Sequence, residues 1–235
     1  MSGQAPAASN VRVGVAIPAA GTGQRMGGVR KAFLEILGQP LLLRSLEPFL
    51  AEPRVQAVVV AVGADVLDDP PEWLEELAPR VHLVAGGATR AASVRHAMAA
   101  LPRDVDVIAI HDAARPLLRA EVLSACIEKA AAGVGAVAGA PAVDTMKEVD
   151  AEVRITGSPD RSRLWHAHTP QVFPAPLLRR AYAGDAEATD DAALVAAVGG
   201  VVELVDDGGW NIKVTRPDDV RVVEALLIDA RTVDP

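Results

Sequence analysis

The sequence is poor in the features that mark several classes of protein. Its 235 residues include one cysteine, Cys126, which excludes a disulfide framework and a cysteine-based zinc site. No apolar run reaches the roughly 18 residues of a membrane-spanning helix, and residues 1–10 lack the pattern of a secretory signal. Because 50% of the residues are apolar, the composition also excludes a disordered chain. We therefore expect a globular cytoplasmic protein that does not bind membranes, with Cys126 buried and unreactive.

Acidic residues are absent from three stretches of an otherwise acidic chain. The formal net charge of −8 argues against a nucleic-acid partner. Yet no aspartate or glutamate precedes Glu35, and none lies within 77–103 or 208–217. These stretches combine cations with glycine-rich turns, which favours binding of a small polyanion. Lysine is scarce, at 4 residues against 19 arginines, and two of the lysines, Lys31 and Lys213, lie in these stretches, where a compact ammonium suits phosphate.

Continuous apolar runs alternate with helical patterns along the chain. Such runs predict strands that are buried on both faces, as in a parallel sheet covered by helices. The alternation therefore predicts an α/β fold with a Rossmann-like, mostly parallel sheet sandwiched by helices. The predicted strands are 11–18, 55–62, 81–85, 105–111, 136–141, 201–205 and 213–215. The predicted helices are 89–101, 119–132, 190–198 and 217–230.

One stretch, 143–168, departs from this pattern because it is polar and alternating, with Gly157 and Pro159 near its middle. It predicts a projecting β-hairpin arm, and a long surface loop is the alternative. Excursions of this length tend to be lids or oligomer contacts. We expect a flexible N-terminal tail over 1–10, followed by a single domain over 11–232 that includes the arm.

A glycine-rich loop follows the first predicted strand. Small residues at 19–23 let the backbone approach a ligand closely, and their N–H groups can cradle phosphate. The loop lacks the Gly-Lys-Ser/Thr of a Walker motif, and Met26 stands where a dinucleotide-binding loop needs its third glycine. What remains are two cations, Arg25 and Lys31, which fit the charge stabilisation of phosphoryl transfer. A solvated helix start with surface cations is the simpler alternative.

The end of the predicted strand 81–85 carries a second glycine turn. Gly87 could approach a base edge and the Ser93 hydroxyl could bond one, with Arg90 as the nearby cation. The simpler alternative is that Thr89 caps the helix that follows.

Asp112 follows the predicted strand 105–111 directly. A carboxylate there could hold Mg²⁺ or a sugar hydroxyl, and Arg115 could pair with it or with substrate. Lys213 stands between apolar neighbours on the last predicted strand, so it could point into the same cleft or into solvent. His166 and His168 do not predict a metal site, because no third ligand is in register.

These motifs together resemble the 2-C-methyl-D-erythritol 4-phosphate cytidylyltransferase family. The resemblance spans residues 11–230 in the family's order, although Ala88 replaces an acidic residue that members often carry. The matching segments are PAAGTGQRM at 18–26 with Lys31, GGATRAASV at 86–94, HDAARP at 111–116, DTMK at 144–147, RSRLWHAHTPQ at 161–171, TDDA at 189–192 and NIKVTRPDD at 211–219.

The resemblance implies a nucleotidyltransferase-type fold, a homodimer formed through the hairpin arm, and Mg²⁺ as cofactor. CTP and methylerythritol phosphate would give the CDP-alcohol and pyrophosphate, in non-mevalonate isoprenoid precursor synthesis. The acceptor phosphate would attack the α-phosphate of CTP, so positioning and electrostatics would suffice without a general base. The nearest alternative is a cytidylyltransferase for ribitol 5-phosphate or another polyol phosphate. A silent nucleotide-binding subunit and a dinucleotide-binding protein are weaker alternatives.

The resemblance also implies roles for individual residues. Arg25 and Lys31 would stabilise charge on the triphosphate, and Lys213 would orient the attacking phosphate together with Arg161, which could serve the partner's site. Asp112 would contact the substrates and the metal. The expected substrate-binding residues are Pro18, Ala19, Ala20, Gly21, Thr22, Gly23, Gly87, Arg90, Ser93, Asp112, Arg115, Thr145, Thr169 and Thr189.

Overall fold

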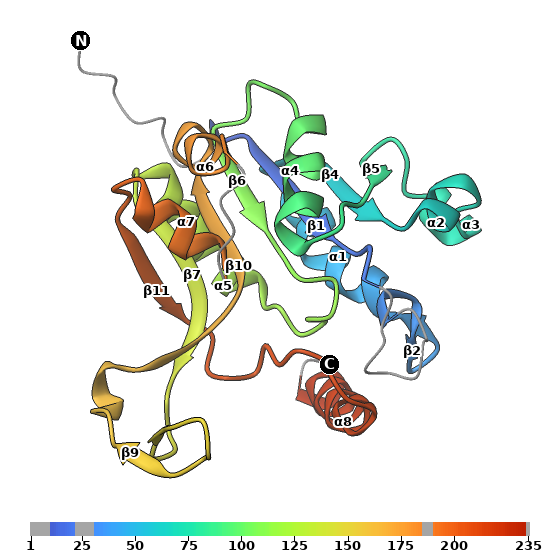
Figure 1. Ribbon diagram of the computed structural model, residues 1–235. Coiled ribbons are helices and arrows are strands. Elements are labelled where there is room, and N and C mark those ends of the chain that lie inside the picture. Colours follow the sequence, from blue (N-terminus) through green and yellow to red (C-terminus); the bar gives the residue numbers. More distant parts are fainter. Residues whose placement is uncertain (1–9, 22–30, 185–189, 234–235) are drawn as a thin grey trace.

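A seven-stranded sheet organises the protein, in the strand order β11-β7-β10-β6-β1-β4-β5 (Figure 1). The computed structural model describes residues 10–21, 31–184 and 190–233. Among these strands β10 runs antiparallel to both neighbours, β6 and β7, and the other pairs are parallel. The predicted α/β class with a mostly parallel sheet is confirmed. The strands are β1 (Val13–Pro18), β4 (Val55–Val62), β5 (Val81–Ala85), β6 (Val107–Ile110), β7 (Gly135–Pro141), β10 (Trp165–Pro174) and β11 (Val202–Asp206).

Helices cover both faces of this sheet and link its parallel strands (Figure 1). None of the described helices is long and apolar enough to cross a membrane. The helices are α1 (Leu41–Ala51), α2 (Ala64–Asp68), α3 (Glu72–Glu75), α4 (Arg90–Ala100), α5 (Ala120–Ala131), α6 (Ala175–Ala181), α7 (Asp191–Ala197) and α8 (Pro217–Val233), with short 3₁₀ turns η3 (Lys31–Phe33) and η4 (Arg161–Arg163). Two small antiparallel pairs complete the fold, β2 (Glu35–Ile36) with β3 (Gln39–Pro40), and β8 (Glu148–Val149) with β9 (Ile155–Gly157).

Strand β1 shows why the apolar runs are continuous. Val15 and Ile17 belong to one buried cluster, which includes Phe49 of α1. Ala16 points to the opposite face and belongs to a second cluster, which includes Met98 of α4. Because successive side chains alternate between two covered faces, every position of the strand is apolar. The strand is thereby fixed at the centre of the sheet, and its carboxyl end is held in place for the loop that follows.

The predicted strand at 213–215 is wrong. The chain there follows an irregular path, and Val214 N donates to Ala114 O at 2.9 Å instead of joining the sheet. Val214 is buried in a third small cluster with Val223 of α8. The apolar and polar alternation around Lys213 therefore reflects packing of this segment between the loop after β6 and the last helix.

The expected arm is confirmed in part. Strands β8 and β9 form a small hairpin that projects from the body of the molecule (Figure 1). Residues 165–168 belong instead to β10, whose Trp165 pairs with Pro141 of β7, so the arm ends before them. Of the expected N-terminal tail, residues 1–9 lie outside the described residues, and the division into tail and domain stays a prediction.

Candidate active site

A cavity of about 620 Å³ opens beyond the carboxyl ends of β1, β5 and β6. This is the edge at which parallel α/β sheets bind their ligands. The loops after the three strands supply most of its wall, and Lys31 and Lys213 add cations from two other segments. The lining residues are Pro18, Ala19, Ala20, Gly21, Lys31, Ala32, Gly87, Ala88, Thr89, Arg90, Ser93, Asp112, Ala113, Ala114 and Lys213.

Two of these loops are held side by side at the end of β4. Ala19 N donates to Ala61 O and Gly86 N donates to Val62 O, each at 2.7 Å, so both loops continue the edge of β4. A Cβ on Gly86 would overlap the Cβ of Ala20, and glycine is therefore required for the loops to meet. The result is a wall of main-chain atoms that a ligand can approach closely.

Ser93 shapes the second loop from within. Gly87 N donates to Ser93 Oγ at 3.0 Å, and the hydroxyl donates to Thr89 O at 3.1 Å. Thr89 also caps α4, because its Oγ1 accepts from Ala92 N at 3.1 Å. The single hydroxyl proton of Ser93 is thus already used in the hydrogen bond to Thr89 O. Its expected contact with a base is limited to accepting a further hydrogen bond.

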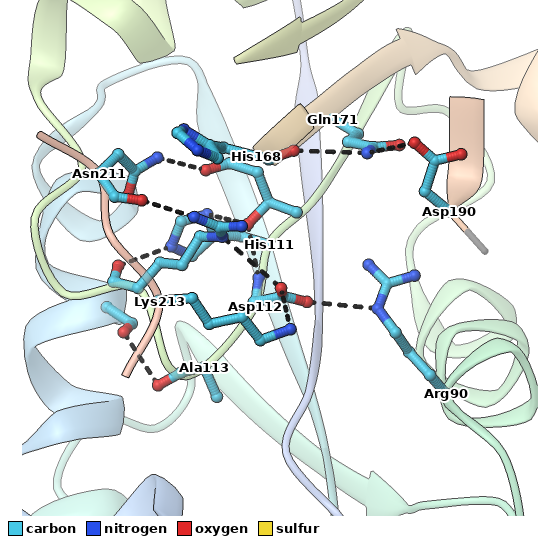
Figure 2. Close-up of polar contacts among 12 residues, drawn as sticks. Arg90, His111, Asp112, Ala113, His168, Gln171, Asp190, Asn211 and Lys213 are labelled. Carbon is cyan, nitrogen blue, oxygen red and sulfur yellow. Dashed lines mark hydrogen bonds and ion pairs between the residues drawn. The ribbon is translucent and has the colours of Figure 1, made fainter. Parts of the chain in front are cut away.

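Asp112 is the centre of the charged part of the cavity (Figure 2). Its Oδ2 lies 2.7 Å from Lys213 Nζ and 3.7 Å from Arg115 Nε, and its Oδ1 lies 3.2 Å from Arg90 Nε. Burial opposes its ionisation, but the three cations outweigh burial and hold the pKa of Asp112 well below its usual range. The carboxylate is therefore charged and fixes the cations that surround it.

A buried histidine supports Asp112 from behind. His111 is fully buried, and burial lowers its pKa to about 4. The neutral ring donates from Nε2 to Arg115 O at 3.0 Å and accepts at Nδ1 from the Thr169 hydroxyl at 3.1 Å. Thr169 Oγ1 in turn accepts from Asp112 N at 3.0 Å. Thr169 was expected to bind substrate, but it is buried and holds the Asp112 backbone in place.

A second cavity of about 640 Å³ lies on the other side of Lys213, between β10 and α8. Arg115 lines it and donates from Nη1 to Asn211 O at 2.6 Å, which fixes the segment that carries Lys213. Lys213 lines both cavities, so its ammonium stands at their junction. The lining residues are Arg115, Trp165, His166, Ala167, His168, Ile212, Lys213, Thr215, Asp219 and Val222.

Arg161 and Thr145 lie on the arm, away from both cavities of this chain. Both are exposed, and Arg161 Nη1 donates to Val143 O at 2.6 Å. The predicted site residues Thr22, Gly23, Arg25 and Thr189 lie outside the described residues. The other predicted residues, apart from Thr169, line one or both cavities.

Sequence reasoning missed the buried network behind the cavity. Asp190 and Asp191 stand together at the start of the predicted helix 190–198, but only Asp190 caps α7, where its Oδ1 accepts from Ala193 N at 3.0 Å. Asp191 is fully buried and pairs with Arg90, and Tyr182 donates its hydroxyl proton to the same carboxylate. An acidic pair at a helix start gives no sign of which member turns inward, so the sequence held no signal for this contact.

Among the described residues that line the first cavity, Asp112 is the one carboxylate. Among the described residues, no group of three or more His, Cys, Asp or Glu side chains could hold a metal ion. Mg²⁺ is usually bound by one or two carboxylates together with substrate phosphates and water. Asp112 therefore fits as a ligand of an ion that arrives with a triphosphate, and the residues that the structure describes form no cage of three or more such ligands.

Comparison with known proteins places the chain in a family. The model of the 2-C-methyl-D-erythritol 4-phosphate cytidylyltransferase family matches residues 13–229. An enzyme of that name from Symbiobacterium thermophilum is 42% identical over 223 residues, covering 92% of this chain and 93% of its own length. The crystal structure of the Thermus thermophilus enzyme of the same name has a TM-score of 0.77 at 33% identity, covering 92% of this chain and 98% of its own. The chain therefore belongs to the 2-C-methyl-D-erythritol 4-phosphate cytidylyltransferase family.

Proposed function

We propose that the protein transfers a cytidylyl group from CTP to 2-C-methyl-D-erythritol 4-phosphate, with release of pyrophosphate. The observation that carries this proposal is the pairing of Lys213 with Asp112 at the junction of two cavities. One cavity can take the nucleotide and the other the acceptor, and the ammonium stands between them. Family membership supports this acceptor over ribitol 5-phosphate, because the relatives carry the methylerythritol activity in their names.

The nucleoside half of CTP would occupy the wall of backbone atoms formed by residues 18–21 and 86–88. Close approach of main-chain N–H and C=O groups suits recognition of a base edge and of phosphate oxygens. Lys31 lines the same cavity and would stabilise the charge that grows on the leaving pyrophosphate. Arg25 would act with it.

The acceptor phosphate would be the nucleophile. One of its oxygens forms a bond to the α-phosphorus of CTP, and the bond from the α-phosphorus to the bridging oxygen of the β-phosphate breaks. The electron pair leaves with pyrophosphate, so no proton has to be removed from the attacking anion. Lys213 and Arg115 would orient that phosphate, and Asp112 would keep Lys213 in register. Mg²⁺ would neutralise triphosphate charge, with Asp112 as its single protein ligand.

We further propose that the enzyme is a homodimer in which the arm completes the partner's site. Arg161 and Thr145 line neither cavity of this chain, and the arm exposes apolar side chains, with Val143 74%, Val153 77% and Ile155 67% accessible. Apolar surface of this kind is typical of an interface. The cytoplasmic location expected from the sequence stays a prediction.

Phosphorus NMR tests the proposed reaction directly. CTP, Mg²⁺ and 2-C-methyl-D-erythritol 4-phosphate are incubated with the protein, and the spectrum is followed for a new diphosphate diester together with free pyrophosphate. Both signals should grow at equal rates. Loss of CTP as CMP or CDP, without the diester, would contradict the transfer of a cytidylyl group to the acceptor.

A further inference from the structure

Arg90 joins two carboxylates of very different exposure. Its Nε lies 3.2 Å from Asp112 Oδ1 in the cavity. Its two terminal nitrogens lie 3.0 and 2.8 Å from the two oxygens of Asp191, which is fully buried behind the cavity at the start of α7. Tyr182, also buried, donates its hydroxyl proton to Asp191. Asp191 is thus held by both Arg90 and Tyr182, and its two oxygens bind the two terminal nitrogens of the guanidinium in a fixed orientation.

The charges around Asp112 compete for its two oxygens. Arg90, Arg115 and Lys213 all lie within ion-pair distance of it. An arginine with free terminal nitrogens binds a carboxylate through two parallel hydrogen bonds, which are stronger than a single contact. In this structure Arg90 meets Asp112 through Nε alone, because Asp191 takes both terminal nitrogens. Arg90 thereby stays off Oδ2 of Asp112, which Lys213 Nζ contacts at 2.7 Å and Arg115 Nε approaches to 3.7 Å.

The buried carboxylate of Asp191 depends on this pairing, because removing a charge from water is strongly unfavourable unless a partner compensates for it. Burial also opposes the charge on Arg90, but attraction to Asp191 and hydrogen bonds with it outweigh burial and raise the pKa of Arg90 above its ordinary value. The guanidinium of Arg90 therefore stays charged, and its contact with Asp191 fixes this cation at the wall of the cavity.

We propose that Asp191 is a positioning residue for the transfer reaction: by holding the terminal nitrogens of Arg90, it keeps that guanidinium off the oxygen of Asp112 that Lys213 contacts. The proposal rests on the proposed function, since it assigns Lys213 to the reaction. Tyr182 contributes by fixing the Asp191 carboxylate. Without Asp191, Arg90 would turn its fork toward Asp112 and displace the ammonium of Lys213 from its place between the two cavities.

Asp191→Asn tests this because it keeps the size of the side chain and removes its charge. We expect kcat to fall about tenfold or more, since small displacements of positioning groups have effects of this order, with the KM for CTP within about threefold of wild type. A raised KM for CTP with unchanged kcat would overturn the proposal.

A double-mutant cycle separates positioning from general support of the fold. The Arg90→Gln background has no guanidinium for Asp191 to hold, so Asp191→Asn should there lower kcat by less than about twofold. An equal loss of kcat in both backgrounds would show that Asp191 does not act through Arg90, and would overturn the proposal.

Asp106→Asn provides the matched control. Asp106 also accepts two hydrogen bonds from an arginine side chain, Arg12, at 3.1 Å each, but it lies before β6, at the opposite end of the sheet from the cavity. Its substitution should lower the melting temperature and leave kcat within about twofold of wild type. A tenfold loss of kcat in this control would mean that loss of any such ion pair impairs the enzyme, and would overturn the proposal.

If Asp191→Asn does not fold, Tyr182→Phe decides the question. It removes one hydrogen bond to Asp191 and keeps the aromatic ring that packs under Arg95. We expect kcat to fall about threefold in the wild-type background and to stay unchanged in the Arg90→Gln background; an unchanged kcat in both would overturn the proposal. The wild-type enzyme is assayed alongside, so a failure of the proposed function appears as absence of product from wild type.

Discussion

Lys213 Nζ lies 2.7 Å from Asp112 Oδ2, across a sequence separation of 101 residues. The loop after β6 places the carboxylate, and the irregular segment before α8 brings the ammonium to it. Two hydrogen bonds fasten that segment, from Val214 N to Ala114 O and from Arg115 Nη1 to Asn211 O. The junction of the two cavities is therefore formed by contacts between two loop segments, which the hydrogen bonds of the sheet and of the helices do not align.

Lys213→Ala should lower kcat about 100-fold, because removing one preorganised charge at a reacting phosphate has effects of this size. Steady-state kinetics with CTP and the acceptor measure it. Lys129→Ala is the control, since Lys129 forms an exposed pair with Glu203 far from the cavities and should change kcat by less than about twofold. A higher KM for CTP with unchanged kcat would contradict the role given to Lys213.

His111→Asn should make the stability of the protein less sensitive to acid. The folded chain holds the pKa of His111 at about 4, whereas an unfolded histidine titrates near 6.5. Between these values the unfolded chain binds a proton that the folded chain does not, so the free energy of unfolding falls as the pH falls from about 6.5 to 4. Over this pH range the titration of His111 lowers the free energy of unfolding by about 3 kcal/mol.

Urea unfolding at several pH values measures that prediction. At pH 7 the variant should be less stable than wild type, because the shorter asparagine does not reach Arg115 O, which loses its donor. The difference in the free energy of unfolding between wild type and the variant should narrow as the pH is lowered to 4. A constant difference across this range would contradict a buried neutral histidine.

Gly86→Ala should weaken CTP binding more than tenfold and lower the melting temperature. The added Cβ would overlap Ala20 and approach Val62 O at 3.2 Å, so the two loops that form the backbone wall would separate. Calorimetric titration with CTP and Mg²⁺ measures the affinity. Gly184→Ala is the control, because nothing lies within 4 Å of its added Cβ. Unchanged affinity in Gly86→Ala would show that nucleotide does not bind against this wall.

Mixing two inactive variants, Lys31→Ala and Arg161→Ala, tests whether the arm completes the partner's site. If Arg161 acts across a dimer, half of the exchanged dimers are mixed and each of these has one intact site, so activity should recover to about a quarter of wild type. If Arg161 acted in its own chain, no intact site would form. Absence of recovery after verified subunit exchange would therefore contradict the shared site.

The sequence predicted the layered fold well because burial on both faces leaves a continuous apolar run, as in β1 and β4. It predicted most of the first cavity because small residues and polar side chains follow the ends of those runs. It missed β10, whose first half is polar and exposed while its second half is buried, so no single periodicity covers the strand.

The contacts behind the cavity could not be predicted for a different reason. The pairing of Arg90 with Asp191 joins residues 101 positions apart, and each side chain alone has an ordinary explanation, as a surface cation and as a helix cap. Thr169 looked like a substrate contact because it lies in a polar motif, but its hydroxyl is consumed by His111 and the Asp112 backbone. Such roles depend on which polar groups are buried together, which the fold decides.

The most direct test of the account is pyrophosphate release measured with each of four nucleotides and two acceptors. The protein is supplied with Mg²⁺, with CTP, ATP, GTP or UTP, and with 2-C-methyl-D-erythritol 4-phosphate or ribitol 5-phosphate. We expect rapid release with CTP and 2-C-methyl-D-erythritol 4-phosphate and loss of that release in Lys213→Ala. Release with ribitol 5-phosphate instead, or no release from folded wild-type protein with any pair, would contradict it.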